Sequence, residues 1–225
     1  MATDVYLEVG SKRVFACSLA WPGWCRAGKT EELALEALAA YVPRYRVVAE
    51  RAGVRFPKGA GEQLRVVERL PGSATTDFGA PGEAASSDQQ PVSAAGAARA
   101  AKLLTASWAV FDQVAATAPA ELRKGPRGGG RDRDKMVDHV LGAEAGYARK
   151  IGVRHRQPAI GDRAAISALR EAILAVLATP WDGTPLAPKA WPPPYATRRI
   201  AWHALDHAWE MQDRSGPGDG HGDGA

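Results

Sequence analysis

The sequence predicts an α+β protein in which a small N-terminal β-β-β-α-β domain precedes a C-terminal four-helix bundle. Residues 1–72 contain short segments of alternating apolar and polar residues, which is the pattern of half-buried strands. Residues 73–92 are mainly Gly, Ala, Ser, Pro, Asp and Gln, so we expect a linker or a long loop there. Residues 93–214 show helical periodicity, and residues 215–225 are expected to form a disordered tail.

The N-terminal domain is expected to contain four strands. Alternation and β-branched or aromatic residues predict two strands at residues 5–9 and 13–19, joined as a hairpin. A short third strand is expected at residues 25–29. Residues 64–70 form the fourth predicted strand, which a Pro-Gly pair closes.

One helix is expected between the third and fourth strands. Thr30 is a suitable N-cap, and apolar residues recur at helical spacing from Leu33 to Tyr41. Pro43 ends or kinks this helix, because proline lacks the backbone N–H and clashes with the preceding turn.

The C-terminal part is expected to contain four amphipathic helices. They are predicted at residues 94–117, 134–151, 162–177 and 197–214. Packing them into a four-helix bundle is the simplest way to bury their apolar faces.

Composition indicates a globular protein without a membrane segment. Of the 225 residues, 45% are hydrophobic and 24% are charged, and no apolar run approaches the length of a transmembrane helix. The N-terminus lacks the pattern of a signal peptide, so we expect a cytoplasmic protein. The net charge of +4 is modest and concentrates in residues 123–135 and 149–156, so nucleic acid is not an expected partner.

Several classes of enzyme are disfavoured by the absence of their motifs. The sequence contains no Gly-x-Ser-x-Gly, no phosphate-binding Walker loop and no dinucleotide fingerprint. Cys17 and Cys25 do not form a Cys-x-x-Cys pair, which suits buried or idle thiols in a reducing compartment. The sequence does not decide whether the two cysteines form a disulfide.

The histidines form the most informative functional pattern in the chain. His203 and His207 are four residues apart in a predicted helix, so their imidazoles share one face. His139 lies in another predicted helix and can approach the same point. Three imidazoles make an open site for a divalent metal such as Zn, Ni or Fe, with a position left for water or substrate. The alternative is a chance pair of histidines in core or exposed positions.

Glu210 extends the histidine face of the last predicted helix. It follows His207 by three residues and His203 by seven. Its carboxylate can orient His207, accept a proton from a metal-bound water, or bind the ion itself. Glu210 is therefore the candidate catalytic residue.

The segment 126–134 precedes the helix that carries His139 and is rich in glycine and arginine. Arg127 and Arg131 can bind an anionic group of a cofactor or substrate at the helix N-terminus. The alternative is a solvated loop in which Asp132 or Asp134 caps the helix.

The C-terminal part, from about residue 94 to residue 214, resembles the DinB-like superfamily. The motifs that carry the resemblance are Asp138-His139-Val140-Leu141-Gly142-Ala143-Glu144 and His203-Ala204-Leu205-Asp206-His207. The resemblance implies an up-down-down-up bundle in which His139, His203 and His207 hold a divalent metal. The superfamily includes mycothiol- and bacillithiol-linked transferases and maleylpyruvate isomerases, so it also implies a low-molecular-weight thiol. Glu144 is expected to pack behind the site or to form a salt bridge.

The N-terminal part, from about residue 5 to residue 70, resembles HicB-like domains, best known from antitoxins. The resemblance lies in Phe15-Ala16, Pro22-Gly23, Gly28-Lys29-Thr30 and Glu31-Glu32. It implies a module that binds a protein partner or forms oligomers. The alternative is an ordinary small α+β domain that packs on the bundle.

Together, these patterns predict a cytoplasmic, metal-dependent enzyme that activates a thiol or water to act on a small-molecule substrate. Such an enzyme would be a thiol-dependent transferase, an isomerase or a hydrolase. The alternative function is that of a HicB-like binding or regulatory protein with the bundle as scaffold. A membrane is not an expected partner, and a homodimer stays open.

Overall fold

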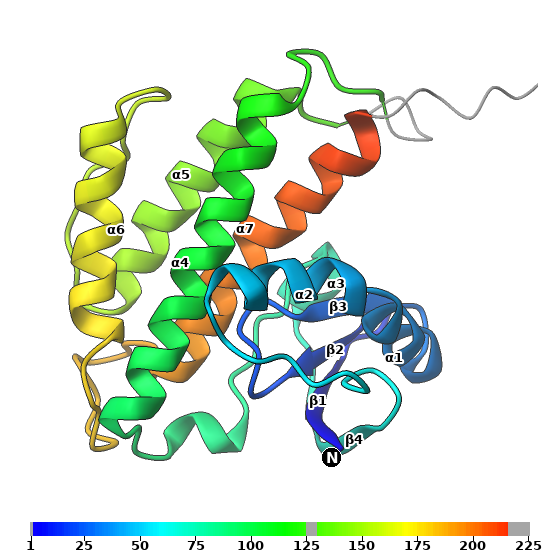
Figure 1. Ribbon diagram of the computed structural model, residues 1–225. Helices are drawn as coiled ribbons and strands as arrows, with labels where there is room; N and C mark the ends of the chain where they lie inside the picture. The colour runs from blue at the N-terminus through cyan, green and yellow to red at the C-terminus, as the bar shows by residue number, and fades with distance from the viewer. Residues whose placement is uncertain (1, 125–129, 216–225) are drawn as a thin grey trace, which may run out of the picture.

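The computed structural model describes residues 2–124 and 130–215, and its fold is α+β, as predicted. A four-stranded sheet with two helices lies beside four long helices (Figure 1). Arg127, a candidate ligand-binding residue, lies outside the described residues, and so does the predicted tail beyond residue 215.

The sheet contains the four expected strands, each within two residues of its predicted bounds. They are β1 (Thr3–Val9), β2 (Val14–Ser18), β3 (Cys25–Gly28) and β4 (Leu64–Pro71). The strand order is β3-β2-β1-β4. The pairs β1/β2 and β2/β3 are antiparallel, whereas β1 and β4 are parallel.

Two helices, rather than the single expected one, connect β3 to β4. Helix α1 (Glu31–Ala40) begins at Thr30, whose side chain accepts a hydrogen bond from the Leu33 N–H. Helix α2 (Val42–Arg51) follows after a bend and has Pro43 in its first turn, where the missing N–H costs no hydrogen bond. Helix α1 therefore ends just before Pro43, in line with the expectation from the sequence, and the proline lies in the first turn of a second helix.

The segment 73–92, expected to be a linker or a long loop, packs against the sheet. It contains helix α3 (Ala74–Phe78) and the 3₁₀ helix η1 (Ser86–Gln89). The buried Glu8 carboxylate of β1 accepts hydrogen bonds from the N–H groups of Gly82 and Glu83, at 2.9 and 3.0 Å. These contacts are polar, so a hydrophobicity pattern does not reveal them. Ala85 also packs in a small apolar cluster with Trp202.

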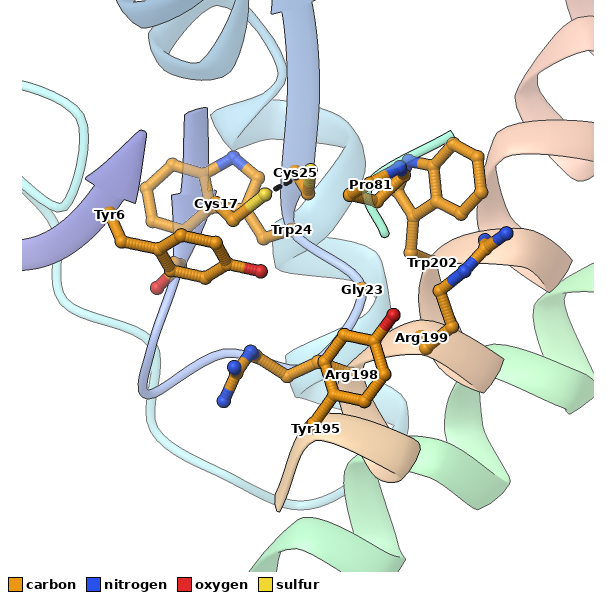
Figure 2. Close-up of a pocket in the computed structure, with 11 residues that line it drawn as sticks. Tyr6, Cys17, Gly23, Trp24, Cys25, Pro81, Tyr195, Arg198, Arg199 and Trp202 are labelled. Carbon is orange, nitrogen blue, oxygen red and sulfur yellow. Dashed lines mark hydrogen bonds between the residues drawn. The ribbon is translucent and has the colours of Figure 1, made fainter. Parts of the chain in front are cut away.

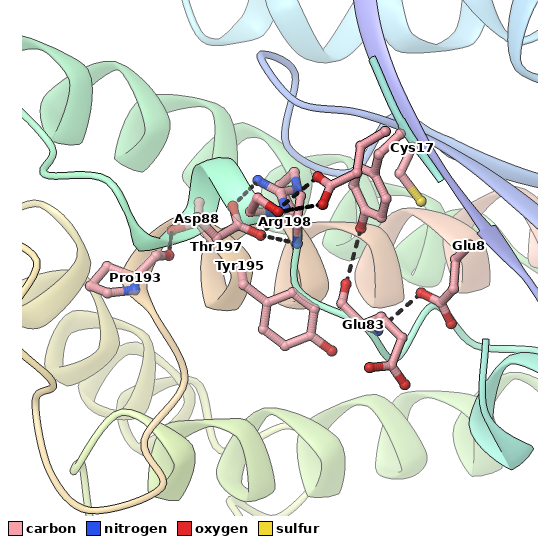
Figure 3. Close-up of polar contacts among 12 residues, drawn as sticks. Glu8, Cys17, Glu83, Asp88, Pro193, Tyr195, Thr197 and Arg198 are labelled. Atoms are coloured by element: carbon pink, nitrogen blue, oxygen red, sulfur yellow. Dashed lines mark hydrogen bonds and ion pairs between the residues drawn. The ribbon is translucent and has the colours of Figure 1, made fainter. Parts of the chain in front are cut away.

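A buried ion pair ties the same segment to the C-terminal part. Asp88 of η1 is 1% exposed and Arg198 is 7% exposed. The Arg198 guanidinium donates two hydrogen bonds to the carboxylate, with Nη1 2.6 Å from Oδ1 (Figure 3). Residues 85–89 are thus fixed to the last helix.

The four long helices lie close to their predicted positions. They are α4 (Ala94–Thr117), α5 (Arg133–Lys150), α6 (Arg163–Leu177) and α7 (Pro193–Ser215). Helix α7 begins four residues earlier than expected, because prolines are compatible with the first turn of a helix. None of the described helices is long and apolar enough to cross a bilayer.

Backbone hydrogen bonds between helix ends give the directions of these helices. Val92, before α4, pairs with Trp181, after α6, so these two helices are antiparallel. The Trp191 N–H, before α7, donates to the carbonyl of Lys150 at the end of α5. Helices α4 and α7 therefore run in one direction, and α5 and α6 run in the other (Figure 1).

The two parts of the chain share one continuous hydrophobic core. The cluster extends from Val5 in β1 to Met211 in α7. Gly23, between β2 and β3, has φ of +89° and lies so close to α7 that a Cβ atom there would be 2.6 Å from Leu205 Cδ1. A larger residue would meet both backbone strain and a steric clash. This contact packs the β2–β3 connection directly on α7.

We expect Asp88→Ala to lower the free energy of unfolding by about 3–5 kcal/mol, because it leaves the Arg198 cation buried without its partner. The control is Asp4→Ala, which removes an exposed ion pair with Arg65 and should cost less than about 1 kcal/mol. Urea unfolding of both variants measures the difference. Equal decreases in the free energy of unfolding would show that the Asp88–Arg198 pair does not anchor residues 85–89.

Candidate metal centre

The structure brings the three predicted histidines together between α5 and α7. Their ligand nitrogens all lie within 4.8 Å of one another. The Nε2 atoms of His139 and His203 are 3.2 Å apart. Two nitrogens bound to one tetrahedral zinc ion, each at about 2.1 Å, would lie about 3.4 Å apart. The spacing is therefore close to that of ligands sharing an ion.

The local helix geometry explains this convergence. His203 and His207 are one turn apart on α7, and their ring centroids are 4.7 Å apart. The ring of His139 on α5 lies 5.0 Å from each of them. Among the described residues, these three form the group of His, Cys, Asp or Glu side chains that is close enough to share an ion.

The environment keeps two of the imidazoles neutral. Burial lowers the pKa of His139 to about 4, and the nearby positive charges of His207 and Arg131 act in the same direction. Burial also holds the pKa of His203 well below its usual value. Both rings are thus uncharged at neutral pH, which is the form that binds a metal.

Glu210 supports His207 from the side. Its Oε2 lies 3.1 Å from Nδ1 of His207, and its Oε1 accepts a hydrogen bond of 2.8 Å from Arg214. The hydrogen bond with His207 is the main reason that the pKa of Glu210 lies below its usual value. Since a carboxylate only accepts, Nδ1 of His207 donates and Nε2 keeps the lone pair. Of the three roles open from sequence, orientation of His207 fits this geometry.

His203 lacks such a partner. Its Nδ1 is buried and has no hydrogen bond within the part of the chain that the structure describes. Its ring instead contacts Tyr147 of α5 edge to face, with the centroids 5.6 Å apart. Packing, rather than a hydrogen bond, fixes the orientation of this imidazole.

Sequence reasoning missed two residues beside the histidines. The Arg199 guanidinium lies 5.1 Å from the centroid of the Tyr147 ring, which itself packs on His203. Helical spacing contained the signal, because Arg199 precedes His203 by four residues and Tyr147 follows His139 by eight.

A cavity of about 490 Å³ opens on the other side of Tyr147. Ala143, Gly146 and Trp191 contribute to its walls, and Arg149 and Lys150 add positive charge. A Cβ atom at Gly146 would meet only the end of the Arg149 side chain, at 3.8 Å, so this face of α5 is open. Tyr147, one of its lining residues, packs on His203, but none of the three histidines lines this cavity.

The other candidate residues lie around this centre. Arg131 is exposed just before α5, and its charge contributes to the low pKa of His139. Asp132 occupies the N-cap position of α5, but its carboxylate accepts from the Leu122 N–H and from Lys124. Arg131 is thus placed to attract anions, and Asp132 serves mainly to hold the preceding loop.

Glu144 lies outside the histidine cluster and forms a salt bridge, which is one of the two roles expected for it. Its carboxylate is 1% exposed and lies 3.1 Å from Nε of Arg170 on α6. Arg170 also pairs with Asp112 on α4, at 2.7 Å. This network connects three helices outside the candidate site.

A second, enclosed pocket lies between the sheet and α7 (Figure 2). Cys17 and Cys25, paired across β2 and β3, line it as buried free thiols with their sulfur atoms 2.6 Å apart. Tyr195, Arg198 and Arg199 also line this pocket. Its thiols do not belong to the histidine cluster, so they are not ligands of the candidate metal centre.

No protein-family model matches this chain, and no curated protein or solved structure matches it either.

We expect the metal-free protein to lose stability as the pH falls from 6.5 towards 4. The folded-state pKa of His139 is about 4 whereas the ordinary value is 6.5, so the unfolded chain binds protons first and is favoured by acid. His203 acts with the same sign. Urea unfolding at a series of pH values gives the free energy of unfolding as a function of pH. This free energy should change less steeply with pH in His139→Gln. The control His155→Gln, in the loop after α5, should keep the original slope; identical slopes in both variants would contradict the assignment.

Proposed function

We propose that His139, His203 and His207 hold a divalent metal ion and that the protein is a metal-dependent enzyme activating a thiol or water. The observation that carries this proposal is the approach of three ligand nitrogens to within 4.8 Å of one another from two helices. Zinc, nickel and iron all accept imidazole ligands. Three protein ligands leave at least one coordination position for a reactant, whereas a structural site is normally closed by four.

The burial of the site suits a catalytic ion. His203 is 6% exposed and His207 is 9% exposed, while His139 is half-buried and lies at the accessible side. A divalent ion in this place lowers the pKa of the thiol or water that it binds, which supplies a nucleophile at neutral pH. The rings of Tyr147 and Trp202 lie beside His203, with centroids 5.6 and 6.1 Å from that of the imidazole.

The residues of the chain have separate tasks in this proposal. Glu210, fixed by Arg214, holds His207 with Nε2 turned to the ion and is therefore a positioning residue. The cavity beside Tyr147 receives the substrate. The thiol must come from a separate molecule, because Cys17 and Cys25 are buried in the enclosed pocket between the sheet and α7.

The resemblance to the DinB-like superfamily supports a thiol-dependent transfer or isomerisation, with a low-molecular-weight thiol as the second reactant. Hydrolysis would use the same histidines with water in place of the thiol.

The purified full-length protein should bind one equivalent of Zn²⁺ or Co²⁺. We expect His203→Ala to weaken binding by more than about 100-fold, because losing a ligand costs more than the 10–100-fold typical of a supporting residue. His155→Ala is the matched control and should bind normally. Calorimetry and the visible spectrum of Co²⁺ measure both. Unchanged binding in His203→Ala would exclude this site.

Turnover should depend on the same ligands. The metal-loaded protein is assayed with thiol-acceptor pairs and with activated esters, and His203→Ala should abolish whichever activity appears. A protein that binds one metal through these histidines, yet turns over neither group of substrates, would contradict the enzymatic part of the proposal and leave the metal site intact.

Glu210→Gln should weaken metal binding by about 10–100-fold while the protein stays folded, since the neutral amide orients His207 less strongly. The control Glu36→Gln changes an exposed carboxylate on α1 and should have no effect. Equilibrium dialysis with Zn²⁺ against a competing chelator gives both affinities. An unchanged affinity for Glu210→Gln would show that Glu210 does not position the ligand.

A further inference from the structure

Arg199 differs from the other buried charged side chains. Arg170 pairs with Glu144, Arg198 pairs with Asp88, and Glu8 accepts backbone N–H groups. Arg199 is only 8% exposed, yet no carboxylate of the described residues forms a salt bridge with it. Its Nη1 is fully buried and has no hydrogen-bond partner in the same residues.

The unpaired cation lies next to the candidate metal centre. Arg199 is one turn before His203 on α7, so the two side chains share a face. Its guanidinium lies 5.1 Å from the centroid of the Tyr147 ring and 4.6 Å from that of the Trp202 ring. Arg198 and Arg199 extend in opposite directions, and only Arg198 turns toward the buried ion pair with Asp88 (Figures 2 and 3).

The excess of positive charge around Arg199 favours the binding of an anion. The Tyr147 side chain forms a hydrogen bond with Arg199, but a neutral hydroxyl and two aromatic rings offset only part of the cost of burying a cation without a counter-ion. A divalent ion between the histidines would add further positive charge a short distance away. The cavity beside Tyr147 is lined by Arg149 and Lys150, whose charges attract anions, whereas Arg199 itself lines the small pocket between the sheet and α7.

We infer that Arg199 binds the carboxylate of a small-molecule substrate whose reacting group lies at the His139, His203 and His207 centre. This assignment rests on the proposed metal centre and adds the substrate class to it. A carboxylate suits the position because a planar guanidinium donates to it in a fixed geometry, and a desolvated pair of this kind discriminates well against neutral analogues. Arg199 is in this scheme a specificity-determining residue.

The test uses the full-length protein loaded with Co²⁺ and simple thiols as probes. Thioglycolate, 3-mercaptopropionate and 4-mercaptobutyrate each carry a thiol for the ion and a carboxylate at increasing separation. Each is compared with its primary amide, which has nearly the same size and no charge. Binding is followed by the change in the Co²⁺ spectrum and by calorimetry.

We expect the carboxylate to bind at least about tenfold more tightly than its amide for one chain length. Arg199→Gln should remove this preference while keeping the metal stoichiometry and the affinity for the amide. Arg199→Lys keeps the charge and should retain part of the preference. Arg163→Gln, an exposed arginine at the start of α6, is the matched control and should behave as the unmodified protein.

The outcomes separate the two proposals. A protein that binds Co²⁺ but shows no preference for any carboxylate overturns the role of Arg199 and leaves the metal centre standing. This comparison needs no variant, so it holds even if Arg199→Gln does not fold. A preference that persists in Arg199→Gln also overturns the assignment. Failure of the unmodified protein to bind Co²⁺ overturns the metal centre, and the substrate assignment with it.

Discussion

The burial of α7 is the constraint on which the candidate site depends. Sixteen of its 23 residues are buried, and it contacts both the sheet side of the molecule and the helices α4, α5 and α6. The Gly23 connection lies directly on it, and the Asp88–Arg198 pair ties it to the segment after the sheet. Because α7 cannot rotate or slide within this packing, His203 and His207 are held at a fixed height opposite His139 on α5.

The buried charges fall into two groups, those with a partner of opposite charge and those without one. Asp88 neutralises Arg198, and Glu144 together with the more exposed Asp112 pairs with Arg170, so both of these buried arginines have carboxylate partners. Around the histidines, a positive charge lacks such a partner. His139 and His203 are neutral because they are poorly solvated, while Arg199 remains charged nearby without a counter-ion among the described residues. The metal and the anionic ligand that we propose would each satisfy what the other leaves open at this site.

The N-terminal part has a structural task in this arrangement. Its sheet and α1 and α2 complete the core that α7 needs, as in the contact between Tyr41 and Trp209, whose ring centroids are 5.0 Å apart. Arg26 of β3 also pairs with Asp206 of α7, at 2.8 Å. The sheet is therefore coupled to the helix that carries two of the three histidines, although it contributes no ligand of its own.

The amino-acid sequence by itself determined the elements whose cause is local. Alternation placed the four strands, helical periodicity placed the four long helices, and the spacing of His203 and His207 placed both imidazoles on one face. Tertiary structure alone decided the features that depend on distant residues. The segment 73–92 is held by polar contacts that leave no periodic signal and by the packing of Ala85. His139 joins the other histidines only because α5 packs on α7. The unpaired state of Arg199 likewise has no trace in the sequence, since a missing counter-ion is a property of the surrounding fold.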